Sequence, residues 1–188
     1  MRLHAPRIAP VDLDQLDDAQ REALQGFLAQ GRVLNIFRTL ANAPKALTAF
    51  LAWGSYVLSK RNTLPARERE LAILRVGLNC GSGYEWTQHV PIALAAGLTA
   101  AEVERIKDGP GDPAWSPLDG AILRACDELV KDHFVTTPTW QALAELGDRG
   151  RADLVFTVGQ YTQVSMILNS FGVQLDPGQS LDPVLDRR

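Results

Sequence analysis

Signals that start helices recur along the whole chain and are the strongest constraint on its fold. Pro44, Pro65 and Pro117 each stand at the beginning of a stretch with helically spaced apolar residues, a position where the missing proline N–H costs nothing. Thr99 and Glu102 have the spacing of a capping box, in which each side chain binds the backbone N–H of the other residue. No stretch has a convincing strand pattern. The chain is therefore predicted to be all-α.

The positions of the helices follow from apolar residues spaced at three and four positions. Ala-Ile-Leu-Arg occurs twice, at 72–75 and 121–124, and this weak repeat fits one domain of two related helical layers. Pro91 lies inside a predicted helix and predicts a kink. The clearest loop is 108–115, DGPGDPAW. Helices are expected at 12–30, 33–42 (short or irregular), 44–60, 65 to the Gly-Ser-Gly break at 81–83, 84–96, 99–107, 116–131, 137–146 and 153–171.

Length and charge restrict the class of protein. A chain of 188 residues can bury a proper core, so we expect a single domain over 1–188, with an arm at 1–10 and a polar tail at 176–188. The net charge of −3 and the lack of a basic stripe argue against nucleic-acid binding. The apolar runs are too short to span a bilayer, and the N-terminus lacks the apolar core of a signal peptide. We expect a cytoplasmic protein without a membrane partner.

The two cysteines, Cys80 and Cys126, form no Cys-x-x-Cys pair. Their number and spacing predict neither a disulfide framework nor a zinc site. As a structural alternative, both cysteines are buried, reduced thiols that act as small apolar residues. For Cys80 a reactive role stays open, because exposure and thiolate character decide reactivity.

The stretch 64–96 holds the densest group of titratable and aromatic side chains. If its second half is helical, Glu85 and His89 lie on one face, because residues four apart are neighbours on a helix. Ser82 precedes them by about one turn, and Glu70 reaches the same point if the two helices pack as a hairpin. A carboxylate beside an imidazole fixes its tautomer and raises its basicity, which suits proton transfer near neutral pH.

Three segments together resemble the carboxymuconolactone decarboxylase family, which is related to the alkylhydroperoxidase AhpD. The central part is RERELAILRV followed by YEWTQHVPIALAAGL. LNIFRTLANAPKAL precedes it, and DLVFTVGQYTQVSMILNSFGVQL is similar to the C-terminal part of the longer members. The resemblance covers roughly residues 35–175. It implies an AhpD-like, all-helical and oligomeric fold.

The AhpD-type peroxidases carry a glutamate, a Cys-x-x-Cys pair and a histidine in this order. By the resemblance, the glutamate corresponds to Glu70 and the histidine to His89, whereas the two cysteine positions are occupied by Ser82 and Glu85. A thiol peroxidase needs one thiolate to attack the peroxide and a second thiol to resolve the sulfenic acid. Both are absent, and Cys80 stands two residues early without a partner nearby. The resemblance therefore implies the branch that lacks Cys-x-x-Cys.

That branch resembles the type decarboxylase, which removes CO2 from a lactone acid without a cofactor. The resemblance implies that His89 is the proton donor or shuttle, with Glu85 and Glu70 orienting it or acting as base. No metal or organic cofactor is expected, although these three residue types do not exclude zinc. The expected substrate-binding residues are Ser82 and Tyr84 as hydrogen-bonding groups, Trp86 as a platform, and Arg67, Arg69 or Arg75 as the group that grips an anionic substrate.

Each of these side chains also has a structural interpretation. A His–Glu pair four residues apart often lies on a surface, and Trp86 has the size and apolar character of a core residue. Arg67 and Arg69 also fit a solvated helix face. Gln160 and Tyr161 lie in an otherwise apolar helix, where a satisfied buried hydrogen bond is expected.

Three function classes remain open. The first is a cofactor-independent lyase or isomerase that acts by His/Glu proton transfer on a small carboxylate or lactone substrate. The second is a peroxide reductase that uses Cys80 with an external thiol, and the third is a non-catalytic oligomeric binding protein. The apolar stretch 153–171 offers more hydrophobic surface than a small domain easily covers. We therefore expect a homo-oligomer, either a trimer or a hexamer of trimeric symmetry.

Overall fold

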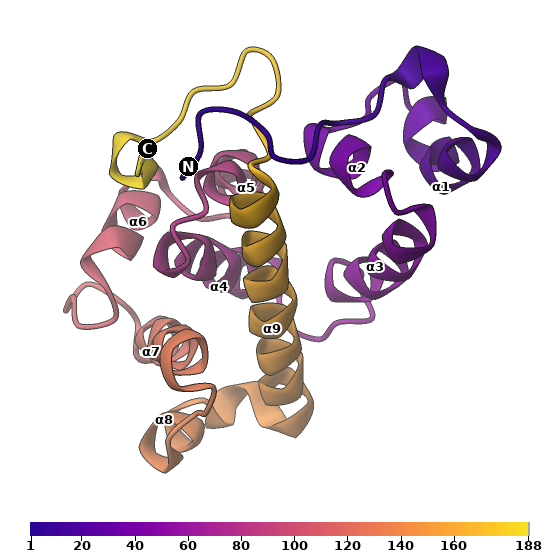
Figure 1. Cartoon of the computed structure of the whole chain (residues 1–188). Coiled ribbons are helices and arrows are strands. Elements are labelled where there is room, and N and C mark those ends of the chain that lie inside the picture. Colours follow the sequence, from indigo (N-terminus) through magenta and orange to yellow (C-terminus); the bar gives the residue numbers. More distant parts are fainter. Residues whose placement is uncertain (188) are drawn as a thin grey trace.

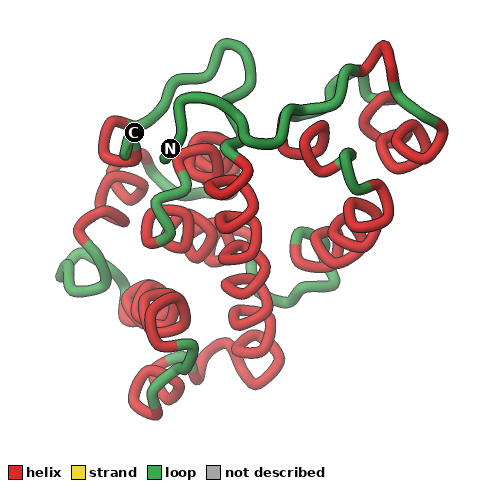
Figure 2. Tube along the Cα trace, in the orientation of Figure 1, coloured by secondary structure: helices red, strands yellow, loops and turns green. Residues whose placement is uncertain are grey.

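The computed structural model describes residues 1–187 and shows an all-helical chain without a β-strand in that range (Figure 1, Figure 2). The prediction of an all-α fold is confirmed. Short 3₁₀ turns lie at Leu13–Gln15, Ile106–Asp108, Ala144–Leu146 and Pro183–Leu185. The α-helices are α1 (Asp18–Ala29), α2 (Asn35–Leu40), α3 (Pro44–Val57), α4 (Ala66–Asn79), α5 (Gly83–Ala95), α6 (Ala100–Arg105), α7 (Pro117–Asp132), α8 (Thr137–Ala142) and α9 (Gly147–Phe171).

The first helix begins later than predicted because of its cap. Helix α1 starts at Asp18 rather than at residue 12. The Asp17 carboxylate accepts a hydrogen bond from the Gln20 N–H at 2.8 Å, and the Gln20 side chain accepts one from the Asp17 N–H at 3.1 Å. This capping box satisfies two N–H groups that have no partner inside the helix, so it defines the start of α1.

Two boundaries near the C-terminal half also differ from the prediction. Helix α9 begins at Gly147 rather than at Asp153. The sequence analysis missed its first turns because they are polar and carry no apolar periodicity. The segment predicted at 137–146 divides into α8 and the 3₁₀ turn at Ala144–Leu146.

Helix α4 lies at the centre of the packing, in contact with α5, α7 and α9. Its Leu71, Ile73 and Leu74 side chains are fully buried, and so are Ile122 and Leu123 of α7. Burial of a large aliphatic side chain contributes about 1.5–3 kcal/mol relative to exposure. The two Ala-Ile-Leu-Arg segments therefore lie in helices that pack against each other and form much of the core.

Helix α9 runs through the middle of the molecule (Figure 1) and contacts α3, α4, α5 and α7. Its buried residues include Leu154, Val158 and Leu168. Most of its apolar surface is thus covered within one chain, so this helix supports an oligomer less strongly than the sequence indicated. Phe156 and Met166 remain exposed, at 42% and 60%.

Helices α1, α2 and α3 form a group of their own beside α9 (Figure 1). The buried Asp153 of α9 anchors the end of this group. Its carboxylate accepts hydrogen bonds from the Tyr56 hydroxyl at 2.6 Å and from the Thr63 N–H and hydroxyl at 2.7 and 2.6 Å. Phe27 of α1 and Phe37 of α2 stack with ring centroids 4.2 Å apart. The group thereby presents an aromatic face to the rest of the molecule.

The arm and the tail are packed against each other, and the two ends of the chain lie close together (Figure 1). The Arg187 N–H donates to the Met1 carbonyl at 2.8 Å, and the Met1 amino group donates to the carbonyl of Leu185. Leu185 is fully buried. No helix of residues 1–187 has the length and apolar character needed to cross a membrane.

Candidate active site

The turn between α4 and α5 allows the predicted catalytic residues to meet. Helix α4 ends at Asn79, and Gly81 adopts a φ of +61°, a conformation that suits glycine because it lacks a Cβ. The Ser82 N–H then donates to the Gly77 carbonyl at 2.8 Å. Helix α5 starts directly afterwards and packs antiparallel beside α4. The hairpin expected from the sequence is thus present.

His89 lies between two carboxylates. Its Nδ1 is 2.7 Å from Glu70 Oε2 on α4, and its Nε2 is 3.1 Å from Glu85 Oε1 on its own helix. The three residues are 7%, 1% and 4% exposed, respectively. This array is withdrawn from solvent, so its charges act at low local dielectric.

The two carboxylates hold His89 as an imidazolium. Burial lowers the pKa of His89, but the hydrogen bonds and charges of Glu70 and Glu85 together outweigh it and raise that pKa to about 9. At neutral pH both ring nitrogens therefore donate, and no single neutral tautomer is selected. Neither nitrogen then has an open lone pair, so His89 can act as a proton donor in this state but not as a base.

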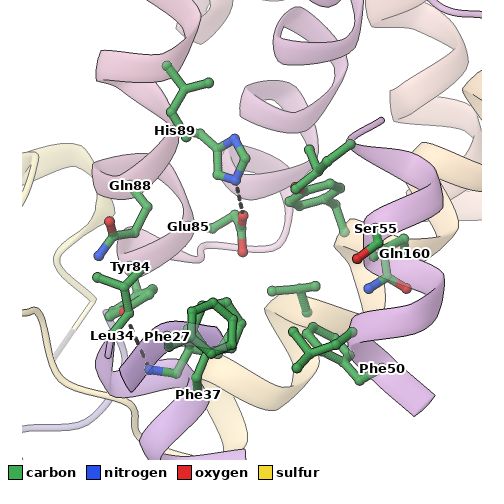
Figure 3. Close-up of a pocket in the computed structure, with 17 residues that line it drawn as sticks. Phe27, Leu34, Phe37, Phe50, Ser55, Tyr84, Glu85, Gln88, His89 and Gln160 are labelled. Atoms are coloured by element: carbon green, nitrogen blue, oxygen red, sulfur yellow. Dashed lines mark hydrogen bonds and ion pairs between the residues drawn. The ribbon is translucent and has the colours of Figure 1, made fainter. Parts of the chain in front are cut away.

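A cavity of about 380 Å³ lies beside this array (Figure 3), within the range of small-molecule sites. Glu85 and His89 line it, whereas Glu70 lies behind them and does not. One Glu85 oxygen is directed at His89 and the other points away from it, towards the apolar side chains (Figure 3). The walls are mainly apolar and include Phe27, Leu34, Phe37, Phe50, Leu51 and Val164.

Helices α1 to α3 supply much of this apolar wall, which the sequence analysis did not identify. Phe27, Phe37 and Phe50 come from three different helices far from the α4–α5 segment. The sequence pattern of each helix predicts that its phenylalanine is an ordinary core residue. No local pattern signals that they converge over Glu85, because the convergence depends on how α3 packs on α9.

Gln160 and Tyr161 of α9 also line the cavity. The Tyr161 ring makes an edge contact with His89, with centroids 5.0 Å apart. Burial raises the pKa of Tyr161 well above its usual range, and the charges of Glu85 and Glu70 raise it further, so its hydroxyl stays protonated. The Gln160 amide oxygen is buried without a hydrogen-bond partner. The expectation of a satisfied buried hydrogen bond was therefore wrong for Gln160.

Arg67 and Arg75 lie outside the cavity and are occupied by other partners. Arg67 donates to the two Asp119 oxygens at 2.8 and 3.2 Å and to Glu102 at 2.5 Å. Arg75 donates to the two Asp127 oxygens at 2.6 and 2.8 Å. Their predicted role of gripping a substrate carboxylate does not fit this geometry, because both guanidinium groups already bind carboxylates that hold α4 to α6 and α7.

The three other predicted substrate contacts have different surroundings. Tyr84 lines the cavity, but its hydroxyl donates to Asp176 at 2.6 Å. Ser82 is 1% exposed, does not line the cavity, and has an unpartnered hydroxyl. Trp86 is buried in the core with the Lys107 ammonium 5.6 Å from its ring centroid. Of these three, only Tyr84 reaches the cavity, and the core interpretation of Trp86 fits its position.

The two thiols lie away from the cavity in the described part of the chain. Cys80 is half-buried at the end of α4 and lines a separate open hollow together with Arg2 and Met166. Burial raises the pKa of Cys80, and it also raises the pKa of the fully buried Cys126. A peroxidatic cysteine needs the opposite shift, towards the thiolate.

Residues 1–187 contain no group of three or more His, Cys, Asp or Glu side chains arranged to hold a metal ion. In the array around His89, both ring nitrogens already face carboxylates. What the array offers is a buried carboxylate facing an apolar cavity, with a cation behind it.

Residues 44–125 match the model of the Carboxymuconolactone decarboxylase family. The predicted family resemblance is confirmed. The matched region contains Glu70, Glu85 and His89, together with α3 to α6 and the first half of α7. No curated protein matches the chain.

Solved structures share the fold of this chain at low sequence identity. One is an alkylhydroperoxidase AhpD core, an uncharacterized peroxidase-related protein from Ralstonia eutropha JMP134, with a TM-score of 0.75, 21% identity, and coverage of 90% of this chain and 93% of its own. An uncharacterized peroxidase-related protein from Silicibacter sp. TM1040 has a TM-score of 0.75 at 16% identity, with coverage of 93% and 95%. A cysteine-to-alanine variant of the debrominase Bmp8 in complex with 2,3,4-tribromopyrrole has a TM-score of 0.67 at 13% identity, with coverage of 93% and 94%. The fold is therefore AhpD-like.

Proposed function

We propose that the protein is a cofactor-independent lyase or isomerase that moves a proton on a small, uncharged substrate held in the cavity. The observation that carries this proposal is Glu85, which lines an apolar cavity while a buried imidazolium binds one of its oxygens. A carboxylate positioned in this way is suited to act as a general base. His89 positions Glu85, and Glu70 stabilises the charge on His89. The proton-transfer role thus moves from His89, where the sequence analysis put it, to Glu85.

In the proposed reaction, Glu85 takes a proton from a carbon next to a carbonyl group. The electron pair of the C–H bond forms a C=C bond, the carbonyl oxygen becomes an enolate, and Glu85 becomes a carboxylic acid. Return of the proton to a different carbon moves the double bond, which is the isomerase reaction. In the lyase reaction, Glu85 takes the proton of an adjacent carboxyl group, the C–C bond to that group breaks and CO2 leaves. The electron pair of that bond forms the enolate, and the enolate carbon then takes the proton back from Glu85.

The charges around the cavity favour an uncharged substrate. The array places two carboxyl groups against the single imidazolium of His89, and no Lys or Arg is among the residues that line the cavity. A carboxylate substrate would be repelled by Glu85 and would lose its hydration without a cation in return. Of the two substrates expected from the sequence, a lactone therefore fits better than a carboxylate. A ketone, which is also an uncharged carbonyl compound, fits as well, and isomerisation fits better than decarboxylation.

A structural neighbour offers a comparison for the size and polarity of such a substrate. The debrominase Bmp8 shares the fold and was solved with 2,3,4-tribromopyrrole, a small and largely apolar ring. A ring of this kind is compatible with a cavity of about 380 Å³ that has mainly apolar walls. The comparison supports the substrate size only, since the chemistry of debromination does not transfer at 13% identity.

The proposal is tested by exchange of carbon-bound hydrogen for deuterium, followed by proton NMR in D2O over a panel of small, uncharged ketones and lactones. Glu85→Gln keeps the size of the side chain but removes the base, and it is expected to lower the protein-dependent exchange rate about 10²–10⁴-fold. Cys80→Ser serves as the control and should keep the rate. Exchange at the wild-type rate in Glu85→Gln would contradict the proposal, and ligand binding without any exchange would favour the non-catalytic class.

The peroxidase alternative has less support in this geometry. Cys80 does not line the cavity, its pKa is raised by burial, and Cys126 is fully buried elsewhere. A reductase that uses Cys80 alone would need an exposed and acidic thiol. The carboxylate that faces the cavity therefore carries the proposal, and no thiol does.

We also propose that the protein forms a homo-oligomer, either a trimer or a hexamer. Trp53 of α3 and Phe156 of α9 are 41% and 42% exposed and touch edge to face, with ring centroids 5.5 Å apart. Such exposed aromatic pairs are typical of contacts between proteins. Light scattering at the mass of a 20.6 kDa monomer would count against this proposal.

A further inference from the structure

Gln160 is a buried polar side chain that has no partner in the wall of the cavity (Figure 3). It is 4% exposed, and its amide oxygen makes no hydrogen bond. Its amide nitrogen lies 3.8 Å from the place of a Cβ added at Gly54, and no hydrogen bond of this nitrogen is described among residues 1–187. An unpaired buried amide is costly, and native structures contain few of them. The amide nitrogen of Gln160, which lines this open volume without a described protein partner, can therefore donate to a bound molecule.

The other glutamine of the cavity wall differs in this respect. Gln88 of α5 also lines the cavity, but its amide nitrogen donates to Asp176 at 2.8 Å and to Gln179 at 3.1 Å. Its hydrogen bonds therefore serve the packing of the tail. Gln160 has none of these internal partners, so its amide remains available to a bound molecule.

We propose that Gln160 is the substrate-recognition residue of this cavity, and that its amide N–H donates a hydrogen bond to the carbonyl oxygen of an uncharged cyclic ketone or lactone. The inference rests on the proposed function, because it places the carbonyl oxygen at Gln160 while the adjacent C–H group faces Glu85. The two residues come from different helices, α9 and α5, so the packing of these helices sets the spacing that a substrate must match.

The chemistry of the two groups is complementary. When Glu85 removes the proton, the C–H electron pair moves into the new C=C bond and negative charge collects on the carbonyl oxygen. A hydrogen bond from Gln160 to that oxygen then strengthens, because bonds to charged acceptors are stronger than bonds to neutral ones. The same N–H gives no comparable stabilisation to a hydrocarbon, and Glu85 repels a carboxylate. The amide thereby selects carbonyl compounds from other apolar rings.

Two matched probes separate this recognition from plain hydrophobic binding. β-Tetralone and tetralin are uncharged bicyclic compounds of similar size that differ by one carbonyl group, and β-naphthoate is an anionic comparison. Their dissociation constants are measured by isothermal titration calorimetry on the full chain. The informative quantity is the ratio of the tetralin constant to the β-tetralone constant, compared between variants, because this comparison cancels the difference in hydrophobicity.

Gln160→Leu and Gln160→Met keep the approximate volume but remove the amide, and both should stay folded because they remove an unpaired buried polar group. In both variants the ratio is expected to fall about tenfold, the size of one hydrogen bond. Ser165→Ala is the matched control. Ser165 is on the same helix, is fully buried and carries a polar side chain, and it does not line the cavity. It should leave the ratio unchanged.

The carbonyl stretching frequency of bound β-tetralone gives a second readout that a purely structural role would not move. Infrared difference spectra should place this frequency lower in the wild type than in an apolar solvent, and Gln160→Leu should return it to the apolar-solvent value. Tighter binding of β-naphthoate than of β-tetralone would overturn the inference. So would a ratio unchanged by either Gln160 variant, an equal fall in Ser165→Ala, or no binding of either uncharged probe up to its solubility.

These results are distinguishable from failure of the proposed function. If Glu85→Gln loses hydrogen exchange but the Gln160 variants keep the binding ratio, only the recognition role fails. If the Gln160 variants change the ratio but Glu85→Gln keeps the exchange rate, the carbonyl-binding site stands and the proton-transfer proposal fails.

Discussion

Two polar clusters extend from helix α4, and they differ in what their charges face. The inner cluster consists of Glu70, Glu85 and His89, which are buried beside the apolar cavity. The outer cluster consists of Arg67 and Arg75 with their carboxylate partners on α6 and α7. In the outer cluster each guanidinium group is bound by carboxylates. In the inner cluster a single cation lies between two anions, and Glu85 keeps one oxygen directed at the cavity.

This difference separates a structural cluster from a candidate catalytic one. Residues of α4 are rotated by about 100° per position, so Arg67 and Arg75 lie about 80° apart while Glu70 lies on the other side of Arg67. Glu70 therefore faces α5 and α9, and the arginines face α6 and α7. Charges whose hydrogen bonds are all used within the protein hold helices together. A charge with an unused acceptor beside an empty volume is available for chemistry.

Among the predictions that compare the two clusters, the largest loss of activity is expected from His89→Gln in the inner cluster. Glutamine keeps some hydrogen bonding to the carboxylates but removes the positive charge that positions Glu85. The protein-dependent hydrogen exchange described above should fall about 10²-fold, the usual cost of a misplaced catalytic group. Circular dichroism should show the wild-type helix content. A His89→Gln protein with full activity would remove the distinction between the two clusters.

The inner cluster should also make stability depend on pH. The pKa of His89 is raised from 6.5 to about 9 in the folded protein. Because the folded value lies above the unfolded value, the stabilisation is complete below about pH 6.5 and is lost as the pH rises through about 9. The free energy of unfolding should fall by roughly 3 kcal/mol across this interval.

Urea unfolding at a series of pH values between about 6 and 10 measures this decrease, because the interval spans both His89 pKa values. His89→Gln isolates the contribution of this residue, since the other titrating groups are the same in both proteins. The two proteins should differ in slope between about pH 6.5 and pH 9. Parallel curves for the wild type and the variant would show that His89 is not the raised group.

In the outer cluster, Arg75→Met should lower stability and leave activity unchanged. Arg75 is 11% exposed and its partner Asp127 is 31% exposed, so removal of the guanidinium group leaves a partly buried carboxylate without its cation, with only the Asn79 amide still donating to it at 2.7 Å. The free energy of unfolding should decrease by about 1–3 kcal/mol, while hydrogen exchange stays within about twofold of the wild type.

Arg124→Met is the matched control for that experiment. Arg124 occupies the same place in the second Ala-Ile-Leu-Arg segment, on α7, but it is exposed. Its replacement should change the free energy of unfolding by less than about 0.5 kcal/mol. Loss of activity in Arg75→Met with unchanged stability would instead restore the substrate-binding role that the sequence predicted for this residue.

Local sequence patterns predicted most of the helices because their caps are local. The Thr99 capping box and the Ser116 cap are both present, and each depends on residues three positions apart. The inner cluster was also accessible, since Glu85 and His89 are four apart and the Gly-Ser-Gly break brings Glu70 beside them. These features depend only on the geometry of one hairpin.

Tertiary packing decided the features that the sequence analysis missed. The partners of Arg67 and Arg75, Asp119 and Asp127, are each 52 positions away, so nothing in the α4 sequence distinguished a bound arginine from a free one. The wall contributed by α1 to α3 and the unpaired amide of Gln160 appear only when α3 packs on α9. The protonation of His89 likewise follows from its hydrogen bonds to two carboxylates, which outweigh the effect of burial, and spacing alone does not show this.

The smallest effect is expected from Cys80→Ser, and it tests whether the inner cluster acts without a thiol. Cys80 lies outside the cavity, and burial raises its pKa. The described hydrogen bonds at this position, from Arg2 and Asn169, go to its backbone carbonyl, which the substitution keeps. Hydrogen exchange should therefore stay within about twofold of the wild type, and the free energy of unfolding should change by less than about 1 kcal/mol.

Iodoacetamide should label Cys80 slowly at neutral pH and faster as the pH rises, because only the thiolate reacts. Rapid labelling at neutral pH, together with an inactive but folded Cys80→Ser protein, would move the chemistry from the carboxylate that faces the cavity to the thiol outside it.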